Sequence, residues 1–233
     1  MIKEAMIEAI AFDWDGVIGD SARVQVQAEK NAATTMAEAL GVELDIDVID
    51  WEKRFPGWGR VKIAAELFDV DPKDEIAENY REQVVGETVK IIDKDTLTPV
   101  IGVKDFLDYT KFRVGNLAVA TSSNRLILDP SIELFNMGDY FRETVAHREC
   151  KDDKPKPGQY LEVARRLNIE PRNLLVIEDS PSGIESGRYA GALVLAVAVA
   201  STKSAEYLRT KTDAHMVASD YEHARYLLQP HMK

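Results

Sequence analysis

The chain has 233 residues, with 29 Lys and Arg against 40 Asp and Glu, and a formal net charge of -11. Its hydrophobic content of 45% suits a globular protein with a core and excludes an intrinsically disordered chain. The acidic balance argues against proteins that hold nucleic acid or an anionic membrane by neutralising phosphates, so we expect no nucleic acid and no membrane as partner.

Five short apolar segments are predicted as strands. They are near-continuous apolar runs rather than alternating ones, which is typical of strands that are covered on both faces. The segments are residues 7–12, 116–120, 144–146, 174–177 and 193–199. Helical patterns lie between the later ones, at residues 103–112, 126–137, 157–167 and 182–190. This alternation predicts an α/β fold with a Rossmann-like, doubly wound parallel sheet.

The stretch from residue 20 to residue 93 shows no convincing strand pattern. It predicts successive helices at residues 21–40, 47–55, 60–68 and 72–92. An all-helical block between the first and second strands of a sheet indicates a separate small domain. We therefore expect a sheet domain made of residues 1–19 and 94–233, interrupted by a helical domain of residues 20–93.

Two single features bear on the compartment. Cys150 is the one cysteine and cannot form an internal disulfide, which fits a reducing environment. The longest apolar run, residues 190–200, is too short to span a bilayer, and residues 1–4 give no signal-peptide pattern. We expect a cytoplasmic protein that is a monomer or a homodimer.

Polar residues that could do chemistry follow the first four predicted strands. In an open parallel sheet, ligands bind at the carboxyl ends of the strands, so these residues would lie close together. Each segment alone is more often a turn, a helix cap or an exposed loop, and only their joint placement indicates a site. The segments are Asp13-Trp14-Asp15-Gly16-Val17, Thr121-Ser122-Ser123-Asn124, Lys154-Pro155-Lys156-Pro157 and Glu178-Asp179-Ser180.

The residue types at these strand ends indicate phosphate chemistry with a metal. Asp13, Asp15 and Asp179 supply hard oxygen ligands, which suit Mg²⁺ rather than zinc, and the sequence has no His/Cys cluster. Three carboxylates packed together without a cation would repel one another, so a divalent ion is the expected neutraliser. Thr121 and N–H groups at a helix start would make a phosphate cradle, and Lys154 would add positive charge beside a phosphoryl group.

The four segments resemble the four ordered motifs of the haloacid dehalogenase superfamily. The matching residues are Asp13 to Val17, Thr121, Lys154-Pro155 and Glu178-Asp179. Within the superfamily, the chain is similar to the subfamily with a helical cap inserted after the first motif, which includes phosphoglycolate phosphatase-like enzymes and β-phosphoglucomutase. The resemblance covers essentially the whole chain, and it implies that residues 20–93 form the cap.

The resemblance implies a role for each catalytic residue. Asp13 would be the nucleophile and form an aspartyl-phosphate. Asp15 would protonate the leaving alcohol and then activate water. Lys154 would stabilise Asp13 and the transferring group. An acid at position 15 favours phosphate-ester chemistry, because the dehalogenases and phosphonate hydrolases of the superfamily lack one there.

The resemblance also implies the binding residues. Thr121 would hydrogen-bond the phosphoryl oxygens, with Ser122 and Asn124 as weaker candidates. Asp13, the backbone carbonyl of Asp15 and Asp179 would hold Mg²⁺, and Glu178 would support the ion directly or from its outer shell. In the cap, Arg60 occupies a position similar to a phosphate-contacting arginine of β-phosphoglucomutase; the alternative is that it merely starts a surface helix.

The resemblance leaves two reactions open. The sequence favours a Mg²⁺-dependent phosphatase that hydrolyses a small phosphorylated metabolite, and the alternative is a β-phosphoglucomutase-type sugar-phosphate mutase. The cap histidine and lysine expected of that mutase are not evident, since Gln25 lies near the first position and Ile76 near the second. Asp153 replaces a glycine that is common in the family before the Lys-Pro pair.

Overall fold

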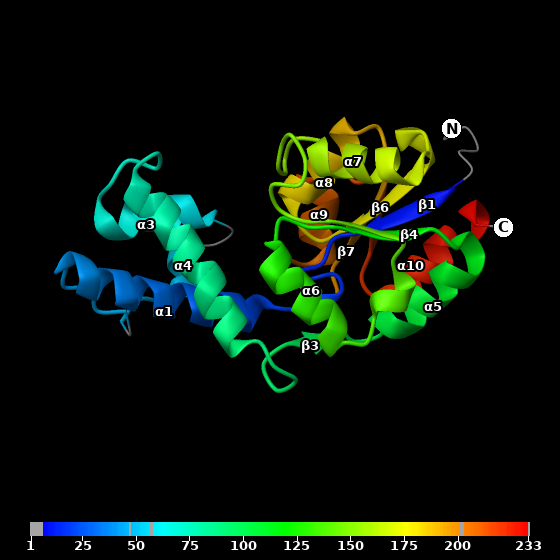
Figure 1. Cartoon of the computed structure of the whole chain (residues 1–233). Coiled ribbons are helices and arrows are strands. Elements are labelled where there is room, and N and C mark those ends of the chain that lie inside the picture. Colours follow the sequence, from blue (N-terminus) through cyan, green and yellow to red (C-terminus); the bar gives the residue numbers. More distant parts are fainter. Residues whose placement is uncertain (1–6, 47, 56–57, 201–202, 233) are drawn as a thin grey trace. The chain divides into compact units, whose positions relative to one another are not determined.

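The computed structural model describes residues 7–46, 48–55, 58–200 and 203–232 (Figure 1). The chain divides into two compact units. We call them the sheet unit, which is Met1–Asp20 with Thr98–Lys233, and the helical unit, which is Ser21–Leu97. No helix in the described part of the chain is long and apolar enough to cross a membrane.

One parallel sheet organises the sheet unit. Its strands, in spatial order, are β5 (Glu143–Val145), β4 (Leu117–Ala120), β1 (Ala9–Phe12), β6 (Leu174–Glu178), β7 (Leu193–Val197) and β8 (Met216–Ala218). The first strand of the chain is therefore central, and Ile10 lies opposite both Leu117 and Leu175. This order confirms the predicted doubly wound α/β fold, because successive crossovers run outward in both directions from β1.

Both faces of the sheet are buried against helices. Ile10 and Phe12 belong to the core on one face, which α5 (Val103–Val114), α6 (Arg125–Leu134) and α10 (Tyr221–Leu228) cover. Ala9 and Ala11 belong to the core on the other face, under α7 (Gly158–Leu167), α8 (Pro181–Tyr189) and α9 (Ala205–Lys211) (Figure 1). Burial on both faces explains why these strands read as continuous apolar runs.

Several elements of the sheet unit were not predicted. They are the edge strand β8, the helices α9 and α10, a two-residue antiparallel pair formed by β2 (Gly19–Asp20) and β3 (Thr98–Pro99), and the 3₁₀ turns at Gly138–Tyr140, Pro171–Asn173 and Gln229–His231. In the predicted helix of residues 157–167, Leu161 is 41% exposed although it is apolar.

The helical unit contains α1 (Ala22–Leu40), α2 (Trp51–Arg54), α3 (Arg60–Phe68) and α4 (Glu75–Ile91). Gly41 closes α1 in the left-handed conformation at φ 66°. The Asp74 carboxylate accepts from Ile76 N and caps α4, so this helix begins three residues later than predicted from Pro72. Residue 47, where another helix was expected to start, lies outside the described residues.

Candidate active site

The turn after β1 brings Asp13 and Asp15 to the carboxyl end of the sheet. Asp13 N donates to Ile177 O of β6 at 3.0 Å, which continues the strand pairing up to the buried Asp13 side chain. Trp14 O then accepts from Ile18 N at 2.8 Å and from Gly19 N at 2.9 Å, so the chain turns back at once. The sharp turn places two carboxylates within three residues at a strand end.

The Lys154 ammonium makes three hydrogen bonds inside this site. It donates to Asp13 Oδ1 at 2.5 Å, to Glu178 Oε1 at 2.8 Å and to Ala120 O at 2.9 Å. The Lys154 side chain is 5% exposed. A buried ammonium with three acceptors has a fixed position, because its three N–H groups are all occupied. Lys154 therefore joins the ends of β4 and β6 to the residue that follows β1.

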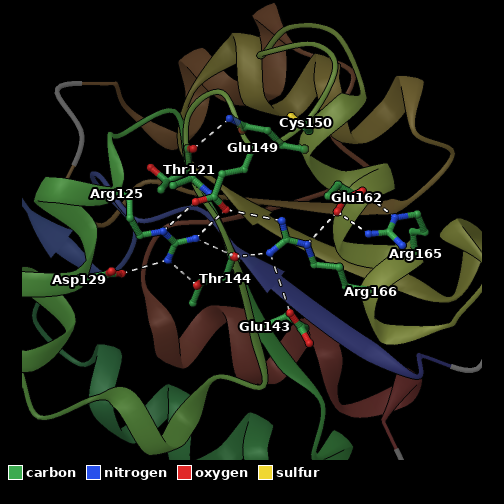
Figure 2. Close-up of polar contacts among 12 residues, drawn as sticks. Thr121, Arg125, Asp129, Glu143, Thr144, Glu149, Cys150, Glu162, Arg165 and Arg166 are labelled. Atoms are coloured by element: carbon green, nitrogen blue, oxygen red, sulfur yellow. Dashed lines mark hydrogen bonds and ion pairs between the residues drawn. The ribbon is translucent and has the colours of Figure 1, made fainter. Parts of the chain in front are cut away.

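The loop that carries Lys154 is anchored by a network of ion pairs, which Figure 2 shows. Arg125, at the start of α6, donates to both carboxylate oxygens of Glu149 at 2.8 and 2.6 Å and to Thr144 O at 3.0 Å. Arg166 of α7 also donates to Thr144 O, at 2.9 Å, and lies 3.6 Å from Glu149. Hydrogen bonding to Arg125 lowers the pKa of Glu149. The network ties the loop to the helices on either side of it.

The segment after β4 holds the hydroxyl groups. Thr121 is buried, its N donates to Val145 O at 2.9 Å, and its Oγ1 accepts from Ser123 N at 3.1 Å. Ser123 Oγ donates to the Asp15 carboxylate. Of the two weaker candidates, Ser122 is exposed, and the Asn124 side chain accepts from Leu126 N as the cap of α6. Ser123, which was not singled out in the sequence, is the hydroxyl that contacts Asp15.

Glu178 is fully buried at the end of β6, and donors surround both of its oxygens. Oε1 accepts from Lys154 Nζ and, at 3.0 Å, from the Tyr160 hydroxyl. Oε2 accepts from Asp179 N, Ser180 N and Ser180 Oγ at 2.9 to 3.0 Å. With five donors on two oxygens, Glu178 is better placed to hold Lys154 than to ligate a metal directly.

Two glycines make room for the carboxylates of Glu178 and Asp179. A Cβ at Gly183 would lie 1.6 Å from Glu178 Oε1, so this residue of α8 allows the carboxylate to sit under the helix. Gly16 has φ +78°, and a Cβ there would lie 2.4 Å from Asp179 Oδ2. Gly187 also approaches the sheet, where a Cβ would meet Val194 Cγ2 at 2.9 Å. Gly183 and Gly187 therefore both allow α8 to approach the sheet closely.

The site carries more negative charge than Lys154 neutralises. Asp13, Glu178 and Asp179 each offer a carboxylate oxygen, and these atoms lie within 4.8 Å of one another. Burial and the neighbouring Glu178 raise the pKa of Asp179 to about 7. Burial also raises the pKa of Asp13, although Lys154 opposes the shift. Such a concentration of buried carboxylate fits a divalent cation with oxygen ligands.

The positive charge of Lys154 and the negative charge of Glu178 neutralise each other in a buried ion pair. Burial alone would lower the pKa of Lys154, but Asp13 and Glu178 outweigh it and hold that pKa well above its usual value. Burial would raise the pKa of Glu178, but Lys154 and the donors around Oε2 lower it. Lys154 is therefore an ammonium and Glu178 a carboxylate at neutral pH.

The structure thus brings together most of the predicted site residues. Lys154 donates to Asp13 and Glu178. The carboxylate oxygens of Asp13, Glu178 and Asp179 lie within 4.8 Å of one another. Asp15 is held near them by the turn and by its contact with Ser123. Arg60 belongs to the helical unit, where it is the first residue of α3 and its Nε lies 3.8 Å from Glu29 Oε1.

Tyr160 of α7 lines the site too, although it was not singled out in the sequence. Its hydroxyl donates to Glu178 Oε1. The signal that could have singled it out is a hydroxyl in the first turn of that helix, six residues after the lysine.

Comparison with known proteins identifies the family. The model for haloacid dehalogenase-like hydrolases matches residues 7–191. A phosphorylated carbohydrates phosphatase from Thermotoga maritima is 29% identical over 185 residues, covering 79% of this chain and 82% of that protein. The fructose-1-phosphate phosphatase YqaB of Escherichia coli is 27% identical over 186 residues, covering 78% of this chain and 92% of that protein.

This chain is also similar to a solved structure. A putative β-phosphoglucomutase from Thermotoga maritima superposes with a TM-score of 0.69 at 27% identity, over 96% of this chain and 99% of that one. The family match includes β1, β4, β6 and the loop of Lys154, so it spans every strand end that contributes to the site. The chain belongs to the haloacid dehalogenase-like hydrolase family.

Proposed function

We propose that this phosphoric monoester hydrolase is a Mg²⁺-dependent phosphatase that acts on a small phosphorylated carbohydrate or a similar metabolite. The observation that carries the proposal is the Lys154 ammonium, held 2.5 Å from Asp13 Oδ1 beside the buried carboxylate of Asp179. The printed names of the relatives, a phosphorylated carbohydrates phosphatase and a fructose-1-phosphate phosphatase, support the substrate class.

The proposed reaction has two steps. In the first, an Asp13 oxygen bonds to phosphorus, the ester P–O bond breaks, and Asp15 gives its proton to the leaving alcohol. In the second, Asp15 takes a proton from water as that water attacks phosphorus, which releases inorganic phosphate and restores Asp13. Ser123 donates to the Asp15 carboxylate and so orients it for both transfers.

Lys154 and Thr121 would act on the phosphoryl group during both steps. The fixed ammonium of Lys154 lies on the nucleophile, where it offsets the negative charge that gathers as phosphorus is attacked. Thr121 is buried at the end of β4, next to the start of α6, and would donate to a phosphoryl oxygen. Donors placed in advance cost no reorganisation when the charge develops.

The proposed metal position lies between Asp13 and Asp179. Their carboxylates, with the carbonyl of Asp15, would hold Mg²⁺, and Glu178 would support the ion from its outer shell because its oxygens already accept from other donors. A bound Mg²⁺ would screen the charges of nucleophile and phosphate, which otherwise repel.

The helical unit and the cellular location complete the proposal. We infer that residues 20–93 act as the cap that selects the substrate and that Arg60 contacts it. We also infer a cytoplasmic location, because Cys150 is the only cysteine and suits a reducing compartment.

A second candidate is a sugar-phosphate mutase, and the likeness to the putative β-phosphoglucomutase favours it. A mutase would pass the phosphoryl group from Asp13 to a second hydroxyl of the sugar rather than to water. Conversion of a hexose 1-phosphate without net phosphate release would support the mutase and contradict the phosphatase.

A screen of phosphate esters tests the proposed function. We expect phosphate release from sugar phosphates, and from an aryl phosphate, in the presence of Mg²⁺. We expect EDTA to abolish the release and added Mg²⁺ to restore it. The measurement is inorganic phosphate released over a panel of sugar phosphates and other phosphorylated metabolites. Phosphate release that persists in EDTA would contradict the metal-dependent mechanism.

Stabilisation by Mg²⁺ should depend on pH. Because the pKa of Asp179 is raised to about 7, the folded chain without metal binds more protons than the unfolded chain between about pH 4 and pH 7, and it loses stability as the pH rises through that window. Mg²⁺ binds the deprotonated carboxylate, so it should raise the unfolding temperature by several degrees at about pH 7.5 and by less than about 1 °C at about pH 5. Thermal unfolding with and without Mg²⁺ measures this.

The matched control is Asp179→Asn, which should abolish the difference between the two pH values. Equal stabilisation at both pH values in the parent protein would show that Mg²⁺ binds elsewhere.

A further inference from the structure

Tyr160 is a buried hydroxyl group that the proposed reaction does not use. Its side chain has no exposed surface, and its hydroxyl donates to Glu178 Oε1 at 3.0 Å. The same oxygen accepts from Lys154 Nζ at 2.8 Å, and the ammonium lies 5.0 Å from the centre of the tyrosine ring. Tyr160 and Lys154 therefore share one acceptor atom, and the ring forms one wall beside the ammonium.

The Lys154 ammonium donates to two carboxylates at once. Asp13 Oδ1 at 2.5 Å and Glu178 Oε1 at 2.8 Å lie on the same ammonium, and Ala120 O takes its third proton. How strongly the ammonium is drawn to each carboxylate depends on what else neutralises that carboxylate. Three donors already occupy Glu178 Oε2, and among the residues that the structure describes, Tyr160 is the group besides Lys154 that donates to Oε1.

We propose that Tyr160 is a positioning residue: by donating to Glu178, its hydroxyl keeps the Lys154 ammonium on the nucleophile Asp13. Without that donor, Oε1 would face Lys154 alone, and the ammonium would settle closer to Glu178 and farther from Asp13. The role rests on the proposed function, since it matters only if Asp13 is the group that attacks phosphorus.

The geometry makes Tyr160→Phe a clean test of the hydroxyl. Phenylalanine keeps the ring beside Lys154 and removes one donor, and Glu178 retains four others, so no buried charge is left without partners. The matched control is Tyr140→Phe. That variant also removes a tyrosine hydroxyl that donates to a carboxylate, Asp108 at 2.5 Å, but away from the site.

We expect Tyr160→Phe to lower kcat by about 10-fold, the lower end of what a hydrogen bond to a charged group is worth. KM and the Mg²⁺ concentration for half-maximal activity should stay within about twofold of the parent values, because the hydroxyl touches neither substrate nor metal. Tyr140→Phe should leave kcat, KM and the Mg²⁺ concentration for half-maximal activity unchanged. A normal kcat, a change in KM alone, or a higher Mg²⁺ requirement alone would each overturn the proposal.

A crystal structure of Tyr160→Phe gives a second measurement that needs no turnover. The distance from Lys154 Nζ to Asp13 Oδ1 should lengthen from 2.5 Å while the contact with Glu178 remains. An unchanged distance would overturn the positioning role, whether or not the parent protein is active. A parent protein that releases no phosphate from any ester would reject the proposed function alone.

A pair of tyrosine analogues at position 160 covers the case in which Tyr160→Phe does not fold. 4-Chlorophenylalanine fills the volume of the hydroxyl without donating, and 4-aminophenylalanine donates. We expect the chloro form to show the 10-fold lower kcat and the amino form to recover most of it. Equal activity of the two forms would contradict the role.

Discussion

Replacing Asp13 by asparagine is expected to abolish turnover, lowering kcat by at least about 10⁴-fold, the scale on which the loss of a covalent nucleophile acts. The amide is nearly the same size as the carboxylate and can still accept from Lys154, but it cannot attack phosphorus. The measurement is phosphate release in saturating Mg²⁺, together with acid-quenched trapping of a labelled phosphoenzyme, which should disappear in the variant.

The fold should survive this substitution. Burial raises the pKa of Asp13, so the carboxylate costs free energy in the absence of metal, and a neutral amide removes that cost. We expect the unfolding temperature of Asp13→Asn without Mg²⁺ to equal or exceed that of the parent at about pH 7.5. The control is Asp129→Asn, an exposed aspartate that pairs with Arg125 in the same unit and should retain activity. A stable, active Asp13→Asn would exclude the aspartyl-phosphate.

Replacing Lys154 by methionine should damage both activity and stability. The variant loses the charge that faces the nucleophile, and we expect kcat to fall by about 10²- to 10³-fold. It also leaves Asp13 and Glu178 buried without their shared cation, which costs roughly 3–5 kcal/mol of unfolding free energy. Because unpaired carboxylates gain protons on folding, the loss of stability should shrink as the pH is lowered towards about 5. Denaturant unfolding at several pH values measures this effect.

The matched control for Lys154→Met is Lys156→Met. Lys156 lies two residues farther along the same loop, its side chain is 69% exposed, and it pairs with Asp152. This exposed ion pair contributes little, so the control should lose less than about 1 kcal/mol and keep its kcat. Equal effects of the two substitutions would show that the loop, and not the buried ammonium, carries the function.

The sheet could be predicted because its strands are covered on both faces. β1, β4, β6 and β7 are entirely buried, and a strand of this kind reads as a continuous apolar run. β8 gives a weaker signal: it has three residues, and Met216 and Val217 are only half-buried at the edge of the sheet. α10 did offer a helical signal, since its buried residues Tyr221, Ala224 and Leu228 recur at helical spacing.

Sequence reasoning found the site through the strand ends but could not see its internal contacts. Topology dictates that the residues after β1, β4 and β6 meet, so Asp13, Thr121 and Asp179 followed from it. Which of three consecutive hydroxyls faces Asp15 depends on backbone torsions, and the structure assigns it to Ser123. That Gly183 makes room for Glu178 depends on an approach between a helix and a strand end, which no local pattern encodes.

The central position of β1 has a consequence for biosynthesis. Ile10 is synthesised before the whole helical unit, yet its pairing partners Leu117 and Leu175 are made only after that unit. The helical unit, Ser21–Leu97, is contiguous and can fold in the meantime, because nascent domains fold as units. Until β4 emerges, β1 is an apolar segment with two open edges, and one edge stays open until β6 emerges, so the nascent segment is exposed to aggregation. Asp13 is thus synthesised well before Ile177 and Lys154, which it contacts in the folded chain.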